Sequence, residues 1–251
     1  WLIINSLKGT TEFLRNPVGL PVKLIFSNYS TMFVEFNLPQ MFINTLLICF
    51  IIPTVSLLIA NGAAYAVAKF KFGLRTVCYT LAMVNIYVSI AGTLPTTYKL
   101  MNNLGLIDSL LGLVIMGSGG LNFDFLLLHG IYVNISNEYR EAAEIDGAGY
   151  WRIFLQIYFP QVFTTTLSLW LLAFIGQWNN YTSPYLFWHS APTLATGIKT
   201  ISDAVANSKE YSLMYPKLFA AMVITIIPVI LIFTCLQRPI SKVSAGGGIK
   251  G

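Results

Sequence analysis

The residues of this chain that could do chemistry by themselves are few, and their spacing does not build a catalytic centre. His129 and His189 have no second histidine or acid at ligand spacing, so neither predicts a metal site. The glycine-rich segment AGGGIKG, 245–251, carries a lysine but lacks the GxxxxGK[ST] spacing of an ATP-binding loop. The sequence therefore predicts a chain that is not an enzyme and binds no cofactor itself.

A charged stretch offers a different kind of chemistry, the binding of another protein. Residues 138–160, EYREAAEIDGAGYWRIFLQIYFP, hold four acidic and two basic residues in a chain that is 55% hydrophobic and only 10% charged. The segment 138–147 is rich in helix-favouring Glu, Ala and Arg, and Gly147 and Gly149 are natural helix stops. Apolar residues return at mixed i, i+3 and i+4 spacing over 151–158, which predicts a second, amphipathic helix along the membrane surface before Pro160.

The first helix of this stretch suits a groove on a partner protein. The small Ala142 and Ala143 permit another backbone to approach closely. Acidic residues that flank them could pair with basic side chains of the partner: Glu138, Glu141, Glu144 and Asp146. A loop that merely joined two helices could be far shorter and purely polar.

The elements that must position this stretch are membrane-spanning helices. A mean hydropathy of +0.67 does not fit a soluble domain, in which about 25% of residues are charged. Apolar runs of roughly 20 residues can cross a bilayer as helices. We expect one all-α membrane domain, residues 1–251, with five complete spans at about 41–68, 76–98, 110–135, 162–187 and 214–236. The opening WLIINSLK is expected to be the outer end of a first helix, giving six in the full protein, and loop 136–161 carries the charged stretch.

The basic residues indicate how these helices are oriented. Lys69, Lys71 and Arg75 lie close together beside a helix end, the pattern that the positive-inside rule associates with the cytoplasm. We therefore expect 69–75, 136–161 and the C-terminal tail in the cytoplasm, and the other connections outside. The net charge of +5 fits contact with anionic membrane lipid, and no clustered basic patch indicates nucleic-acid binding.

Polar side chains inside the expected spans are candidates for a solute path. Asp124 is the one acid in a span, and such an acid is a functional-site hypothesis by default, with structural pairing as the alternative. Sugars need amide groups and aromatic faces, which are offered by Asn85, Tyr87, Asn122, Gln177, Trp178, Asn179, Asn180 and Tyr181. The alternative for each is a hydrogen bond between helices of the bundle. Interior prolines and GSGG, 117–120, are expected to kink or interrupt helices.

The charged stretch also resembles a known motif. EAAEIDGAGYWRIFLQIYFP is similar to the EAA loop in the membrane subunits of binding-protein-dependent ABC importers. The family pattern is EAA, three residues, Gly, nine residues, Ile, one residue, Leu-Pro. This chain has Glu141-Ala142-Ala143, Gly147, Ile157 and Phe159-Pro160, so Phe replaces Leu. Ser136 stands where relatives usually have Pro, which bears on how sharply the preceding helix ends.

The resemblance extends over essentially the full chain. IDGA, 145–148, is typical of the carbohydrate branch, and NTLLICF, QWNNYTSPYLF and LQRPISKVSAGGGIKG resemble segments of maltose-transporter-type sugar permeases. The resemblance implies a bacterial cytoplasmic-membrane protein that pairs with a second permease. It further implies two ATP-binding subunits, which hold ATP and Mg²⁺, and an extracellular or periplasmic sugar-binding protein.

The resemblance also assigns roles within the loop. Each ATP-binding subunit of the family has a groove that accepts one EAA loop as a coupling helix. The residues that match this motif are Glu141, Ala142, Ala143, Asp146, Gly147, Ile157 and Pro160. The glycine turn would act as a rigid elbow, so a side chain at Gly147 should uncouple ATP hydrolysis from transport.

Other functions remain as alternatives. An ion-coupled secondary transporter would need paired intramembrane charges or a visible internal repeat, and Asp124 alone is thin support. An intramembrane enzyme would need a catalytic pair inside the spans. A glycerol phosphodiester or sugar phosphate as cargo would favour Arg or Lys in the path, and the apolar runs have none, so the sequence favours a neutral sugar.

Overall fold

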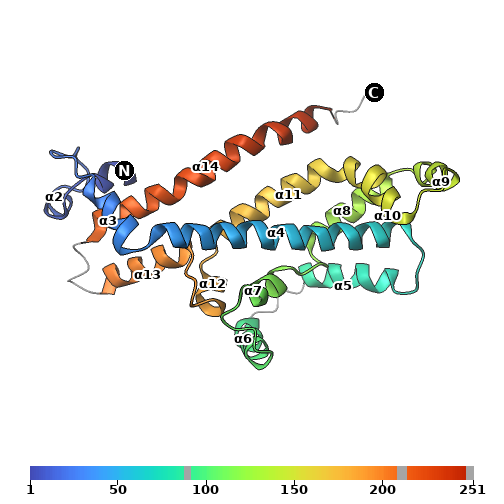
Figure 1. Ribbon diagram of the computed structural model, residues 1–251, viewed down its shortest axis with the longest axis horizontal. Helices are drawn as coiled ribbons and strands as arrows, with labels where there is room; N and C mark the ends of the chain where they lie inside the picture. Colours follow the sequence, from blue (N-terminus) through green and yellow to red (C-terminus); the bar gives the residue numbers. More distant parts are fainter. Residues whose placement is uncertain (88–91, 208–213, 247–251) are drawn as a thin grey trace. The chain divides into compact units, whose positions relative to one another are not determined.

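The computed structural model describes residues 1–87, 92–207 and 214–246, and every regular element within these ranges is a helix (Figure 1). One of them, η1 (Phe154–Tyr158), is a π-helix. The α-helices are α1 (Leu2–Ser6), α2 (Thr10–Arg15), α3 (Ser27–Glu35), α4 (Leu38–Lys69), α5 (Arg75–Tyr87), α6 (Thr93–Asn103), α7 (Leu110–Gly117), α8 (Phe123–Asn134), α9 (Glu138–Ile145), α10 (Tyr150–Ile153), α11 (Phe159–Asn179), α12 (Thr182–Phe187), α13 (Leu194–Asn207) and α14 (Tyr215–Gly246).

The chain divides into two compact units. Unit 1 consists of Trp1–Cys49, Asp108–Leu110 and Ile175–Cys235. Unit 2 consists of Phe50–Ile107, Leu111–Phe174 and Leu236–Gly251.

Three helical stretches of the described chain are long and apolar enough to cross a membrane. They are Leu38–Lys69, which is α4; Tyr150–Asn179, which joins α10, η1 and α11; and Tyr215–Thr234 of α14. These stretches overlap three of the expected spans, those at 41–68, 162–187 and 214–236. The chain therefore has the long apolar helices that a membrane protein needs.

Two further expected spans are each divided between shorter helices. The region 76–98 contains α5 and α6, and α6 begins after Gly92, which adopts a left-handed φ of 83°. Part of this expected span, 88–91, lies outside the described residues. The region 110–135 contains α7 and α8, and GSGG lies at the break between them. Asn122 begins α8, since its Oδ1 accepts the Phe125 N–H at 3.1 Å.

The second helix of the charged stretch differs from its expected form. The sequence predicts a separate surface helix before Pro160, whereas α10, η1 and α11 form one continuous helix through this proline. A proline cannot donate a backbone hydrogen bond, and its ring crowds the carbonyl four residues earlier. The wider π turn directly before Pro160 accommodates the ring, and the Gln161 side-chain amide donates to the Ile157 carbonyl at 2.8 Å. The charged stretch is therefore joined directly to a helix of spanning length.

Unit 2 is centred on a polar contact among three helices. Asn61 of α4 is buried, and its Oδ1 accepts from Tyr132 of α8 at 3.1 Å and from Thr166 of α11 at 3.2 Å. A buried amide with satisfied hydrogen bonds fixes which helix faces meet. The ring of Tyr65 lies between 4.9 and 5.8 Å from those of Phe154, Tyr158 and Tyr132.

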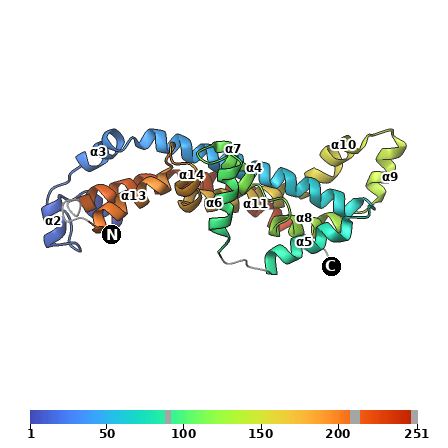
Figure 2. The ribbon, with the colours of Figure 1, turned by 90° about the horizontal axis from the view of Figure 1, so that it is seen from below.

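Unit 1 joins the start of α13 to the first turns of α4 (Figures 1 and 2). Asn44 Nδ2 donates to the Pro192 carbonyl at 3.0 Å, and Thr45 Oγ1 accepts the Leu194 N–H at 2.8 Å. A Cβ at Gly197 of α13 would lie 2.5 Å from the Met41 sulfur, so the two helices approach closely because this residue is glycine.

Candidate functional site

The charged stretch begins with α9, whose end is a complete glycine turn. Gly147 has a φ of 77°, and its N–H donates to the Glu144 carbonyl at 3.0 Å. The Ala148 N–H donates to the Ala143 carbonyl at 2.9 Å. These two bonds form a Schellman motif, which reverses the chain and satisfies the last carbonyls of a helix. Gly147 therefore sets the direction in which the chain leaves α9 toward α10, which lies at the same end of unit 2 (Figures 1 and 2).

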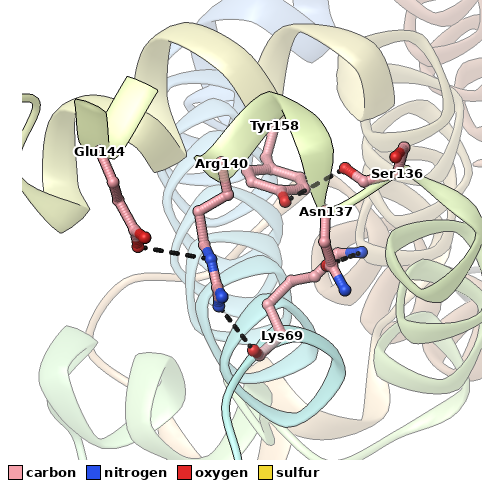
Figure 3. A network of polar contacts seen from close by, with 6 residues as sticks. All are labelled: Lys69, Ser136, Asn137, Arg140, Glu144 and Tyr158. Atoms are coloured by element: carbon pink, nitrogen blue, oxygen red, sulfur yellow. Dashed lines mark hydrogen bonds and ion pairs between the residues drawn. The ribbon is translucent and has the colours of Figure 1, made fainter. Parts of the chain in front are cut away.

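The inner side of α9 is attached to the end of α4 (Figure 3). The Lys69 ammonium donates to the Ile135 carbonyl and, at 3.1 Å, to Asn137 Oδ1. In the opposite direction, Arg140 of α9 donates to the Lys69 carbonyl at 3.2 Å. Arg140 is held in turn by a 3.4 Å ion pair with Glu144, one turn along the helix.

Lys69 also contacts the helix that follows the loop. The Lys69 ammonium lies 5.4 Å from the centre of the Tyr158 ring, a cation–π contact. The Tyr158 hydroxyl points toward the Ser136 carbonyl at 3.5 Å (Figure 3). Because Lys69 ends α4 and Tyr158 lies in the helix 150–179, the base of α9 contacts two helices of spanning length.

The exposed side of α9 combines acids with large apolar residues, Tyr139 and Ile145. The four acids of the loop are exposed: Glu138, Glu141, Glu144 and Asp146. Within the motif, Glu141 and Ala142 face outward, whereas Ala143 is 9% exposed and packs inward. Ile145 is 87% exposed, although an isoleucine is usually buried. A helix with this surface suits docking into a groove of another protein.

A hollow of about 220 Å³ separates α9 from α10 and η1. Its lining includes three residues of the motif, Ala143, Asp146 and Ile157. Pro160, the last residue of the motif, is exposed in the first turn of α11. The structure thus places the predicted loop residues around one helix pair.

Three of the expected solute-path residues meet at the α7–α8 break in unit 2. Asn85 Nδ2 donates to the Leu121 carbonyl at 2.9 Å, Asn122 caps α8, and Asn122 Nδ2 lies 3.4 Å from the Asp124 carboxylate. Each of these contacts holds local backbone or a neighbouring helix. Tyr87 is 78% exposed at the end of α5. The contacts of Asn85, Asn122 and Asp124 are of the kind that the structural alternative describes.

The remaining expected path residues lie in unit 1. Asn180, two residues before α12, accepts the Ser183 N–H at 3.1 Å and donates to Gln177 Oε1 at 3.3 Å. Trp178 and Asn179 differ, because both line a hollow of about 280 Å³ between the end of α11, α13 and α14. Tyr181 lines the same hollow, together with Lys199, Ser202 and Thr225.

Comparison with known proteins identifies the family. The family of binding-protein-dependent transport system inner membrane components matches residues 48–242. This chain belongs to that family. The permease is thus a multi-pass component of a bacterial inner membrane.

Two curated relatives and one solved structure extend the comparison. The diacetylchitobiose uptake system permease NgcG of Streptomyces coelicolor is 28% identical to the permease, over 98% of this chain and 82% of that protein. The sn-glycerol-3-phosphate permease UgpE of Yersinia pestis is 29% identical over 79% of this chain and 69% of that protein. A bacterial ABC transporter involved in the import of the acidic polysaccharide alginate has the same fold. Its TM-score is 0.83 at 24% identity, over 95% of this chain and 88% of that chain.

Sequence reasoning missed the side chains that hold the permease's α9 in place. From the sequence, Lys69 indicates only the side of the membrane on which its loop lies. Its hydrogen bond to the Ile135 carbonyl, 66 positions away, is not indicated by the neighbouring residues. The spacing of Arg140 and Glu144 at i and i+4 could have indicated their ion pair. Ile145 lies between Glu144 and Asp146 in the sequence, and this pattern could have indicated an exposed apolar contact.

The contacts around α9 attach this helix to its neighbours. Within the described ranges of the permease, no three His, Cys, Asp or Glu side chains gather to hold a metal ion. Homologues of the permease are membrane subunits of transporters and not catalysts. Its geometry offers an exposed helix, α9, whose base contacts helices that are long and apolar enough to cross a membrane.

Proposed function

We propose that this permease forms half of the membrane path of an ATP-driven sugar importer. Family membership supports the importer, and NgcG, a disaccharide permease by name, matches nearly the whole chain. The full protein would have six spanning helices and pair with a second, homologous permease. An extracellular or periplasmic sugar-binding protein would deliver the substrate, and two ATP-binding subunits would hold ATP and Mg²⁺.

In this proposal α9 is the coupling helix. The observation that carries it is the division of α9 into two sides: exposed acids with Ile145 outside, and Arg140 attached to Lys69 inside. An ATP-binding subunit would grip the outer side in the cytoplasm. Its closure would move α9 as a rigid body, and the contacts of Lys69 with Asn137 and Tyr158 would carry that motion to α4 and α11.

The hollow beside Trp178 is the proposed part of the sugar path in this chain. Tyr181 and Trp178 offer aromatic faces, and Asn179, Ser202 and Thr225 offer hydrogen-bonding groups. A volume of about 280 Å³ is at the small end for ligand pockets and suits one sugar ring at a time. Asn85, Tyr87, Asn122, Asp124, Gln177 and Asn180 receive at most supporting roles.

A glycerol phosphate cargo is the second candidate, because UgpE is also similar to the chain. The one cation that lines the hollow is Lys199, whose ammonium lies 2.6 Å from Asp203 Oδ2 and 5.9 Å from the centre of the Tyr181 ring. An anionic substrate would have to compete with Asp203 for this charge. The pairing therefore favours a neutral sugar.

Native mass spectrometry of the tagged permease, co-expressed with its flanking genes, tests the proposal. We expect two different permeases with two ATP-binding subunits. ATP hydrolysis by this complex, reconstituted with its binding protein, should rise with diacetylchitobiose or another neutral saccharide of a panel. Stimulation by sn-glycerol-3-phosphate alone would establish the second candidate. A permease that purifies without an ATP-binding subunit would overturn the importer and leave a secondary transporter.

A further inference from the structure

A second hollow of unit 2 lies away from α9. It has a volume of about 230 Å³ and is lined by Val67, Arg75, Thr76, Tyr79 and His129. Its walls are the end of α4, the first turns of α5 and the middle of α8, and α5 and α8 lie side by side (Figures 1 and 2). Arg75 carries a positive charge, His129 can donate a hydrogen bond from its imidazole, and none of the lining residues is acidic.

One buried nitrogen of this hollow has no hydrogen-bond partner within the described chain. His129 Nε2 is buried there without a hydrogen-bond partner. Its ring is held in place by Tyr79 at 5.1 Å and by Phe125 at 5.9 Å between ring centres. Neither ion pair of the described residues involves Arg75, and the first turn of α5 contains no acid. A buried nitrogen without a partner beside an uncompensated guanidinium indicates a site for an anion.

We propose that this hollow binds the phosphate of an anionic membrane phospholipid. Arg75 and His129 donate to the phosphate oxygens, and Thr76 belongs to the same lining. Basic pockets between membrane helices bind lipid headgroups in this way. Arg75 begins α5 and directly precedes the span expected from the sequence at 76–98, so in this proposal the hollow lies at the depth of the lipid headgroups.

The surroundings favour a lipid over a free anion. Apolar side chains follow the hollow along α5 at i, i+4 and i+7, namely Tyr79, Met83 and Ile86. Ile86 is 41% exposed, so an acyl chain attached to the bound phosphate has an apolar surface to lie on. Tyrosine at the level of the headgroups is typical of membrane interfaces. A free phosphate would use the charges alone.

Lipid titration of the purified complex by native mass spectrometry tests this site. The probe is phosphatidylglycerol, whose headgroup is anionic, with phosphatidylethanolamine as the comparison, since its ammonium leaves the headgroup with no net charge. Arg75→Gln should require about fivefold or more phosphatidylglycerol for half occupancy of the tightest lipid adduct. Lys71→Gln removes an equal charge from an exposed position outside the hollow and should change half occupancy less than twofold.

Other outcomes overturn the assignment. Equal phosphatidylglycerol binding by the parent and Arg75→Gln, or equal binding of phosphatidylethanolamine, would show that the hollow does not recognise the headgroup. An Arg75-dependent adduct with inorganic phosphate that blocks the lipid adduct would assign the site to a small anion. Thr76→Glu is the second variant, because an acid in the first turn of α5 favours the helix yet repels a phosphate. It should lose the tight lipid adduct even if Arg75→Gln does not assemble.

Discussion

Arg140 is a single residue whose guanidinium joins α9 to the end of α4. We expect Arg140→Met to lower sugar uptake about fivefold or more relative to ATP hydrolysis, since coupling energies between sites are of this order. The variant removes both the hydrogen bond to the Lys69 carbonyl and the ion pair with Glu144. Uptake and hydrolysis are measured in the same proteoliposomes.

Lys71→Met is the matched control for Arg140→Met. It removes an exposed cation of the same region that lines none of the hollows described here. An Arg140→Met permease with the parental ratio of uptake to hydrolysis would show that this contact does not carry the motion.

A substitution of Gly147 tests the role of the turn that ends α9. No described atom lies within 4 Å of a Cβ built at Gly147, so the cost of a side chain comes from its φ of 77° and from the docking surface. Aspartate tolerates this backbone region better than most residues. We therefore expect Gly147→Asp to assemble and hydrolyse ATP, while uptake falls. Equal uptake and hydrolysis in the variant and the parent would contradict the elbow role.

Asp108 gives a prediction for pH. It has a φ of 59°, its N–H donates to the Phe187 carbonyl at 2.8 Å, and its carboxylate accepts the Ser190 N–H at 2.8 Å. These hydrogen bonds from Ser190, and to a smaller extent His189, lower the pKa of Asp108 below its usual range. A carboxyl whose pKa is lower in the folded state stabilises the fold above its unfolded pKa of about 3.9, and this contribution is lost as pH falls through the folded pKa.

Asp108→Asn isolates that charge, because asparagine also adopts a left-handed φ. We expect the variant to melt below the parent at pH 7, and the difference to shrink as pH falls through about 4 toward 3. Thermal melting in detergent at a series of pH values measures this. A difference that stays constant with pH would mean that the carboxylate charge does not matter.

At the element scale, the close contact of α7 with α4 depends on Gly117. A Cβ there would lie 2.6 Å from Ile52 Cγ2, and Ile52 is buried, so it cannot move away freely. Gly117→Ala should destabilise the permease by about 1–3 kcal/mol and lower its melting temperature. Gly119→Ala is the control in the same segment, because no described atom lies within 4 Å of its Cβ.

Ile52→Leu distinguishes this steric effect from a change in loop entropy. Leucine lacks the branch methyl that faces Gly117, so the double variant should regain part of the lost stability. If Gly117→Ala and Gly119→Ala melt together, the two helices do not need the glycine for their approach.

The elements also mark the limit of sequence reasoning. Long apolar runs indicate α4, α11 and α14 because hydrophobicity and length are local properties, and the stop at Gly147 follows from its backbone freedom. The division of 76–98 between α5 and α6 was not predicted, because a break within an apolar run depends on what the two parts pack against. The continuity of α10 with α11 through Pro160 was missed because a π turn absorbs the ring, and no residue type encodes a π turn.

At the scale of the whole molecule, function depends on chains that bind this one. The proposed coupling residues could be named from the sequence because they match a motif whose residue types and spacing are specific. The attachment of α9 was not readable, because Lys69, Asn137 and Tyr158 meet only in the folded chain. We therefore expect the permease to tolerate substitutions on most lipid-facing surfaces and to lose activity when the residues that attach α9 are replaced.

Single cysteines test the orientation of the whole molecule. Ile145 and Val22 are 87% and 95% exposed, and the sequence places them on opposite sides of the membrane. After replacement of Cys49, Cys78 and Cys235 by alanine, we expect Val22→Cys to react with a membrane-impermeant maleimide in intact spheroplasts. Ile145→Cys should react only after lysis, because a charged reagent cannot cross the bilayer.

The Ile145→Cys variant also measures docking of the ATP-binding subunit. When the ATP-binding subunit is co-expressed, Ile145→Cys should label severalfold more slowly than in the permease alone, because the groove covers the outer side of α9. Val22→Cys labelling should not change. Labelling of Ile145→Cys from outside would reverse the topology. Equal labelling with and without the ATP-binding subunit would mean that this subunit does not bind the exposed side of α9.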